Sequence, residues 1–206
     1  MTDSNVPPSG GTVDTSLSLL ERVKKQDQAA WYQLEQLYTP LVLRWCGQWG
    51  LKDADSEDRR QEVFTAVFNA IGAFRREPPA KTFRKWLRTI THNKVRDYWQ
   101  RIKYQPAAAG GSDHQAWLNE LPAGPPDDEA TAQEEESELV RRALELLRAQ
   151  FEPETWQAWW RTAVDGQPVK DVAKELGLSG NAVYLARSRV RKRLETEFRG
   201  LLDLAP

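Results

Sequence analysis

Apolar residues recur along most of this chain at the three- and four-residue spacing of amphipathic helices. The spacing predicts a helix around residues 17–23, a second helix that Asp27 can cap and that reaches Tyr38, and a third in which Pro40 occupies the first turn. A sustained alternation of apolar and polar residues, which would indicate strands, is not found in the sequence. The pattern therefore predicts an all-α fold.

Two stronger helical patterns follow. A helix is expected after Asp55, because the apolar residues there have the spacing of a buried stripe. A loop at 72–81, broken by two prolines, separates it from a long helix at about 82–103 that combines an apolar side with a basic remainder. The stripe of the first of these helices comprises Val63, Phe64, Val67, Phe68 and Ile71.

The formal net charge of -1 conceals a strong segregation of charge along the chain. Residues 75–103 hold ten bases and two acids, residues 127–138 hold seven acids and no base, and residues 187–199 hold six bases and two acids. Two basic segments on either side of an acidic one indicate two polyanion-binding surfaces joined by a solvated connection.

Composition divides the chain into four parts. Residues 1–14 are polar, contain proline and glycine, and are predicted to be a disordered tail. Residues 15–103 and 137–199 each have helical periodicity and are predicted to be two small helical domains. Residues 104–136 are rich in Ala, Gly, Pro and acids and are predicted to form a flexible acidic linker. Within it, the apolar residues of 117–121 either dock on a partner or pack back on a domain.

The second domain contains a segment with the layout of a helix-turn-helix. A short helix at 168–176 is followed by Gly177, whose backbone freedom permits a tight turn, and by Ser179, which can cap a helix at 180–198. Ala173 is small enough to let the two helices cross. The second helix of such a motif presents its exposed side to the major groove of DNA.

The predicted second helix has one apolar side and one polar, basic side. A helical wheel groups the core-facing residues Val183, Ala186, Val190 and Leu194. The same wheel turns outward the residues Asn181, Leu185, Ser188, Arg189 and Lys192, with Tyr184 beside them. This outward set has the residue types that contact phosphates and base edges.

The sequence offers no sign of catalysis, a cofactor or a membrane segment. One cysteine, Cys46, permits no intramolecular disulfide, and with two histidines it gives no zinc site. A glycine-rich phosphate loop and a nucleophile–base pair are both missing, so neither enzymatic activity nor a cofactor or metal is predicted. No segment approaches 18 consecutive apolar residues and the N-terminus lacks a signal-peptide pattern, so we expect a cytoplasmic protein without a membrane partner.

The helix-turn-helix segment resembles region four of the extracytoplasmic-function (ECF) family of bacterial RNA polymerase sigma factors. The resemblance rests on Asp171–Ser179, with the sequence DVAKELGLS, and on Arg189–Leu194, with the sequence RVRKRL. Independently, residues 55–64 (DSEDRRQEVF) are similar to region 2.2 of that family, and residues 83–93 (FRKWLRTITHN), followed by Asp97, are similar to regions 2.3 and 2.4. Two matches in the family's order, separated by a linker, are far more specific than either alone.

The resemblance implies a promoter-recognition subunit of RNA polymerase. Asp58, Gln61 and Glu62 would bind the clamp helices of the polymerase β′ subunit. The β flap, promoter DNA and an anti-sigma factor are further partners that the resemblance admits. The residues implied in opening and binding the −10 element are Arg75, Arg76, Lys81, Arg84, Arg88, Asn93, Arg96 and Trp99. The residues implied in reading the −35 duplex are Asn181, Tyr184, Leu185, Arg187, Ser188, Arg189 and Lys192.

The predicted recognition helix departs from the family's pattern. The family often has Thr-Val-Lys-Ser-Arg-Leu where this chain has Ala182–Arg187, with the sequence AVYLAR. Tyr184, Leu185 and Arg187 therefore indicate a different base preference or a slightly different docking on DNA. The alternative interpretation is a dimeric helix-turn-helix regulator that does not act as a sigma subunit, and it leaves the first domain unexplained.

Overall fold

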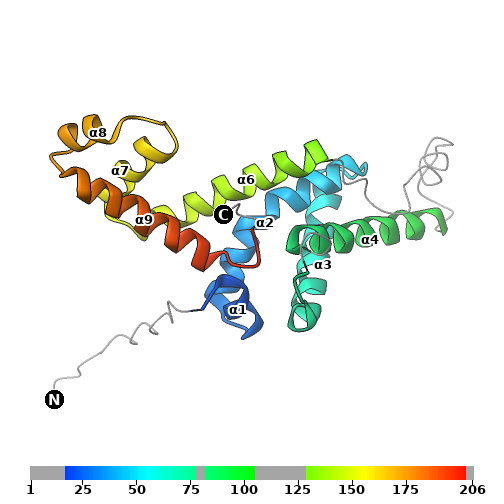
Figure 1. The fold of residues 1–206 in the computed structure, drawn as a ribbon. Coiled ribbons are helices and arrows are strands. Elements are labelled where there is room, and N and C mark those ends of the chain that lie inside the picture. The colour runs from blue at the N-terminus through cyan, green and yellow to red at the C-terminus, as the bar shows by residue number, and fades with distance from the viewer. Residues whose placement is uncertain (1–16, 78–81, 105–128, 203–206) are drawn as a thin grey trace, which may run out of the picture.

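The computed structural model describes residues 17–77, 82–104 and 129–202, and these ranges contain helices and no strand (Figure 1). This confirms the predicted all-α class. The amino-terminal unit, residues 17–77 and 82–104, contains α1 (Leu19–Lys24), α2 (Gln28–Gln48), α3 (Asp53–Ala70), the 3₁₀ turn η1 (Ile71–Ala73) and α4 (Phe83–Tyr104). The carboxyl-terminal unit, residues 129–202, contains α6 (Glu129–Arg148), α7 (Pro153–Ala163), α8 (Val169–Glu175) and α9 (Gly180–Glu197). The predicted tail at 1–14, Lys81 and linker residues 105–128, which include 117–121, lie outside the described residues.

Helix α2 is longer than the sequence pattern predicted. The Asp27 side chain caps it, accepting hydrogen bonds from the backbone N–H groups of Ala29 at 2.9 Å and Ala30 at 3.1 Å. Pro40 does not begin a third helix but lies inside α2. The apolar stripe continues across the proline, and burial of that stripe outweighs the loss of one backbone hydrogen bond. Its buried residues are Ala30, Leu34, Leu37, Tyr38, Leu41, Val42, Trp45 and Cys46.

Helices α2, α3 and α4 pack against one another to form the core of the amino-terminal unit. In α3, Val63, Phe64 and Val67 are buried as predicted. Phe68 is not, since 47% of it is exposed, and its ring meets the Trp31 ring edge-on with centroids 5.3 Å apart. Phe68 lies at the rim of the stripe and stays partly exposed although it contacts Trp31 of α2.

Helices α8 and α9 form the predicted helix-turn-helix. The Ser179 hydroxyl accepts a hydrogen bond from the Ala182 N–H at 3.1 Å and caps α9. Gly177, in the turn, has φ +66°, a conformation that residues with a side chain rarely adopt. The crossing is filled by small side chains, as the sequence suggested for Ala173. The buried members of this cluster are Ala158, Ala173, Val183 and Ala186.

Helix α6 begins at Glu129 rather than near Ser137, so residues 129–136, expected in the linker, are helical. Glu, Ala and Gln, which are strong helix formers, make up all of this stretch except Thr131. Its composition alone indicated a solvated, charged linker. Helix α6 packs on α2 of the amino-terminal unit and on α9 of its own unit. The acidic run therefore belongs partly to an ordered contact between the two units.

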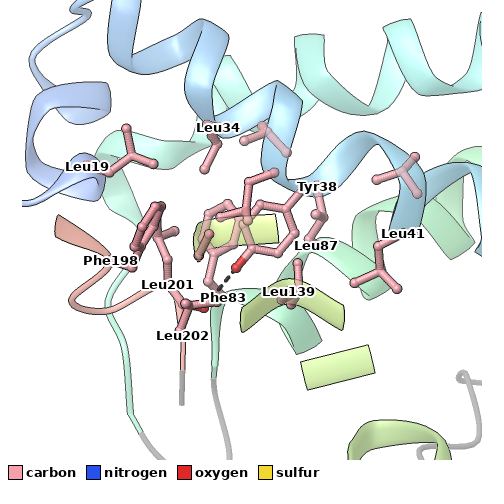
Figure 2. Close-up of a cluster of buried hydrophobic side chains, with 14 of the residues drawn as sticks. Leu19, Leu34, Tyr38, Leu41, Phe83, Leu87, Leu139, Phe198, Leu201 and Leu202 are labelled. Carbon is pink, nitrogen blue, oxygen red and sulfur yellow. Dashed lines mark hydrogen bonds between the residues drawn. The ribbon is translucent and has the colours of Figure 1, made fainter. Parts of the chain in front are cut away.

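The two units share one continuous hydrophobic core. Figure 2 shows the segment after α9 lying beside α1 and α2, with the Tyr38 hydroxyl donating a hydrogen bond to the Leu201 carbonyl oxygen at 2.8 Å. The second domain was predicted to end at residue 199, and this contact was not predicted. The buried residues of this segment are Phe198, Leu201 and Leu202.

Candidate polymerase and nucleic-acid interface

The polar side of α3 carries the three residues expected to bind polymerase. Asp58 and Gln61 are exposed and Glu62 is half-buried, on the side of the helix opposite Val63 and Val67. They line a surface hollow that also reaches across to α4. Its remaining lining residues are Arg59, Thr65, Ala66, Asn69 and Lys94. The hollow thus offers both carboxylates and cations to a partner of mixed charge.

Arg59 is a member of this surface that the sequence analysis did not single out. Its guanidinium lies 5.0 Å from the centroid of the Tyr98 ring, and its Nη1 lies 3.2 Å from Glu62 Oε1. Arg59 therefore forms an ion pair with Glu62 while stacking on Tyr98 of α4. Burial, followed by a hydrogen bond with Asp55, raises the pKa of Tyr98. The three-residue spacing of Arg59 and Glu62 on a helix was the available signal.

A second hollow flanks Gln61 on its other side and is aromatic. It is lined by Trp31, Phe64 and Phe68, together with the polar residues Glu35, Arg60 and Thr65. Tyr32 is 63% exposed on the neighbouring α2. The face of α3 that contains Gln61 therefore combines polar groups with exposed aromatic surface, which is the composition of a protein-binding surface.

Four of the residues expected at the −10 element are exposed. Arg75 donates hydrogen bonds from Nη1 to the carbonyl oxygens of Gly72 and Phe74, both at 3.0 Å. Lys24 Nζ donates to the same Phe74 oxygen at 2.7 Å, and its pKa is lowered by burial and then by the charge of Arg75. These contacts place two cations at the loop before α4. The four exposed residues are Arg75, Arg76, Asn93 and Arg96.

The structure buries three other residues of the expected −10 set. Arg84 and Arg88 are each 4% exposed, and their Nη1 atoms lie 2.5 Å and 3.0 Å from carboxylate oxygens of Glu135. Trp99 is 7% exposed, and its indole N–H donates to the Trp49 carbonyl oxygen at 3.1 Å. In this conformation these side chains do not face solvent, because α6 and the end of α2 cover them. A helical wheel of α4 alone cannot show that α6 and the end of α2 pack over these side chains.

His92 supports the backbone beside the candidate residue Asn93. It is buried, with its ring 5.2 Å from the Trp49 ring and nearly perpendicular to it. Burial lowers the pKa of His92, and the charges of Arg96 and Arg88 lower it further. The imidazole is therefore neutral near neutral pH and contributes packing rather than charge to this face.

The seven residues expected to read the −35 duplex all lie on the exposed side of α9. Tyr184 is 59% exposed and Leu185 is 47% exposed, opposite the buried residues Val183 and Ala186. The remaining five, also exposed, are Asn181, Arg187, Ser188, Arg189 and Lys192. The structure thus leaves all seven side chains exposed on α9.

That face is open and presents cations, a hydroxyl, an amide and a phenol. Such a set can donate hydrogen bonds to phosphates and to guanine edges. No cluster of metal-ligating side chains and no helix apolar enough to cross a membrane occurs in the ranges that the structure describes.

Sequence comparisons relate this all-helical chain to proteins of transcription initiation. The sigma-70 region 2 family matches residues 34–103. The probable RNA polymerase sigma factor RfaY of Xanthomonas campestris pv. campestris is 32% identical over 146 residues, which cover 70% of this chain and 34% of RfaY. The RNA polymerase sigma factor CnrH of Cupriavidus metallidurans is 27% identical over 186 residues, covering 88% of this chain and 93% of CnrH.

These matches support the predicted ECF-type RNA polymerase sigma factor. The chain spans about a third of the length of RfaY. Two solved structures also align with it, each with a TM-score of 0.35. CnrH in complex with the cytosolic domain of CnrY is 23% identical, with 88% of this chain and 96% of that chain covered. The RsbN–BldN complex is 18% identical, with 85% and 96% covered.

Proposed function

We propose that this chain is a non-catalytic subunit that binds core RNA polymerase in the cytoplasm and directs initiation at specific promoters. One observation carries the proposal: a region 2 unit and a helix-turn-helix with an open basic face occur in one chain. The first unit supplies a polymerase-binding surface and the second supplies a duplex-reading helix. A regulator that acts without the polymerase needs no sigma-70 region 2.

Polymerase binding is assigned to the polar face of α3. Asp58, Gln61 and Glu62 present two carboxylates and an amide, and Arg59 forms an ion pair with Glu62. We assign these residues to the β′ clamp helices. The candidate binding site for the β flap is a hollow on the carboxyl-terminal unit, between α6 and α7, lined by Trp156 and Trp160.

The −35 duplex is assigned to α9, whose exposed residues would enter the major groove. Arg189 is placed to bond a guanine edge, an arrangement that contributes about 1–3 kcal/mol of discrimination when it is bidentate. Lys192 lies one turn further along the exposed side and is assigned to a phosphate. Tyr184 and Leu185 give the face a bulkier, less polar start than the family's usual residues.

The −10 element is assigned to α4 and the loop before it. Arg75, Arg76 and Arg96 supply exposed cations for the phosphates of a separated strand, and Asn93 supplies an amide for an unstacked base. Arg84, Arg88 and Trp99 join this surface only when the contacts that bury them have opened.

An anti-sigma factor is a further proposed partner. CnrH has been solved in complex with the cytosolic domain of CnrY, and CnrH is the relative that this chain matches over almost its whole length. We propose a protein partner of this kind for the present chain. The exposed aromatic surface around Phe68 is a candidate contact for it.

A binding titration with purified core RNA polymerase tests the proposal. A sigma subunit must form a stoichiometric complex with core polymerase in the absence of promoter DNA. A helix-turn-helix regulator need not bind core polymerase, and its specific binding to DNA would be complete in the free chain. Absence of a complex with core polymerase would remove the proposal.

A further inference from the structure

Glu135 of α6 is a fully buried carboxylate whose partners all lie in the other unit. Its Oε1 accepts hydrogen bonds from Trp45 Nε1 at 2.6 Å and from Arg88 Nη1 at 3.0 Å. Its Oε2 accepts from Arg84 Nη1 at 2.5 Å. The Arg88 guanidinium also lies 5.6 Å from the centroid of the Trp45 ring. One side chain of the carboxyl-terminal unit thus engages two arginines of α4 at once.

We propose that this contact holds the free chain in a closed state, in which Glu135 occupies the two arginines that the −10 strand requires, and that initiation requires α6 to leave α4. The proposal rests on the proposed function, because it takes Arg84 and Arg88 as −10 residues. Carboxylates and phosphates offer guanidinium groups the same chemistry, a pair of anionic oxygens that can accept two parallel hydrogen bonds. Glu135 and a DNA phosphate therefore compete for the same donors.

The burial of these charges makes the contact all-or-none. Arg84 and Arg88 are both withdrawn from solvent, and Glu135 supplies a buried counter-charge to each of them. Removing one member of a buried ion pair shifts the equilibrium away from the paired state by roughly 100-fold or more. When α6 leaves, both guanidinium groups return to solvent on the α4 surface that already displays Arg96.

A second anchor holds the other end of the carboxyl-terminal unit. Arg22 of α1 forms a buried ion pair with Glu197 of α9, and Arg193 binds the same carboxylate at 3.0 Å. The segment that follows α9 is packed in the shared core beside Leu19 (Figure 2). The closed state therefore joins the units at two separate places, and only the Glu135 anchor covers candidate DNA-binding residues.

A cross-link at the edge of the interface reports whether the chain is closed. Arg44 of α2 and Glu138 of α6 form an ion pair there, with 41% and 19% of their side chains exposed, and such partly exposed pairs contribute little to stability. Cysteines at both positions can be joined by a short bis-maleimide with a cleavable spacer. The native Cys46 is buried, which raises its pKa to about 12, so it stays protonated and protected at neutral pH.

The decisive variant is Glu135→Gln, and Glu134→Gln is its matched control. Both remove one negative charge from α6, but Glu134 is exposed. We expect the Arg44→Cys/Glu138→Cys cross-link yield to fall about tenfold in Glu135→Gln and to stay at the wild-type level in Glu134→Gln. Circular dichroism checks that helicity is kept. If Glu135→Gln loses helicity, Glu197→Gln is used to open the second anchor, and the same cross-link yield is measured. Equal yields in the two glutamine variants of α6 would overturn the closed state.

The functional arm uses a labelled single strand of about 12 mixed-sequence nucleotides, within the usual site size of single-strand binders. The locked chain should bind the strand at least tenfold more weakly than the same chain after the spacer is cleaved, and should initiate with core polymerase only after cleavage. Initiation by the locked chain would overturn the proposal. Glu135→Gln should also raise the affinity for the single strand, and adding Arg84→Ala/Arg88→Ala should remove that gain. If Glu135→Gln opens the chain without such a gain, the −10 placement of the two arginines is wrong and the inhibitory role fails. The proposed binding of core polymerase would not be affected by that result.

Discussion

Ala173 lies where α8 crosses α9, and Ala173→Leu should separate promoter reading from polymerase binding. The site is 6% exposed and surrounded by small buried side chains, Ala158, Val183 and Ala186. Leucine adds three carbon atoms to a helix crossing that small buried side chains fill. Overpacking of this kind costs about 1–3 kcal/mol, which for a chain of this size lowers the melting temperature by about 2–12 °C. Because Ala173 lies at the crossing, the overpacking should displace α9 relative to α8, and −35-dependent transcription should drop.

Ala163→Leu is the matched control, because Ala163 is an exposed residue in the last turn of α7. It adds the same three carbons and should change stability by less than about 0.5 kcal/mol. Thermal unfolding followed by circular dichroism measures the first effect, and transcription from promoters with and without a −35 element measures the second. If Ala173→Leu has the same melting temperature as the control and its transcription still depends on a −35 element, the small residues at the crossing do not position the recognition helix. Binding of core polymerase through α3 should be the same in both variants.

The remaining predictions concern the three interfaces. Gln61→Ala with Glu62→Ala should weaken the complex with core polymerase without loss of helicity, and an unchanged affinity in the titration would count against the α3 assignment. Arg189→Ala should relax the base preference at one or two −35 positions. Lys192→Ala should lower activity on all promoters alike and reduce the slope of log affinity against log salt concentration by about one. If Arg189→Ala changes activity by the same factor on every −35 variant of a promoter library, Arg189 does not read a base. The free chain should bind duplex DNA poorly and the holoenzyme should bind promoters with a steep salt dependence, so tight specific binding by the free chain at physiological salt would favour the regulator.

Local chemistry made much of the fold predictable from sequence. The caps at Asp27 and Ser179, the turn at Gly177 and the small residue Ala173 each depend on a few neighbouring residues, and all four occur as predicted. The outward face of α9 was predictable for the same reason, because a helical wheel needs only one helix. Pro40 shows the limit, since a proline that usually begins a helix lies inside one when packing favours continuity.

Contacts between distant segments were not predictable. Glu135 stands in an acidic run whose composition is that of a solvated linker, yet it is fully buried because two arginines about fifty residues earlier compensate it. For the same reason, a wheel drawn on α4 treats Arg84 and Trp99 as exposed. Phe198 is likewise buried by a neighbouring unit that helical periodicity cannot reveal.

Run-off transcription with purified core RNA polymerase on a promoter library tests the central claim most directly. The account predicts that adding the chain starts transcription from a subset of templates that share −35 and −10 sequences, and that core polymerase alone does not start there. Failure to start transcription on any template, from a chain that is folded and binds duplex DNA on its own, would contradict the assignment as a sigma subunit.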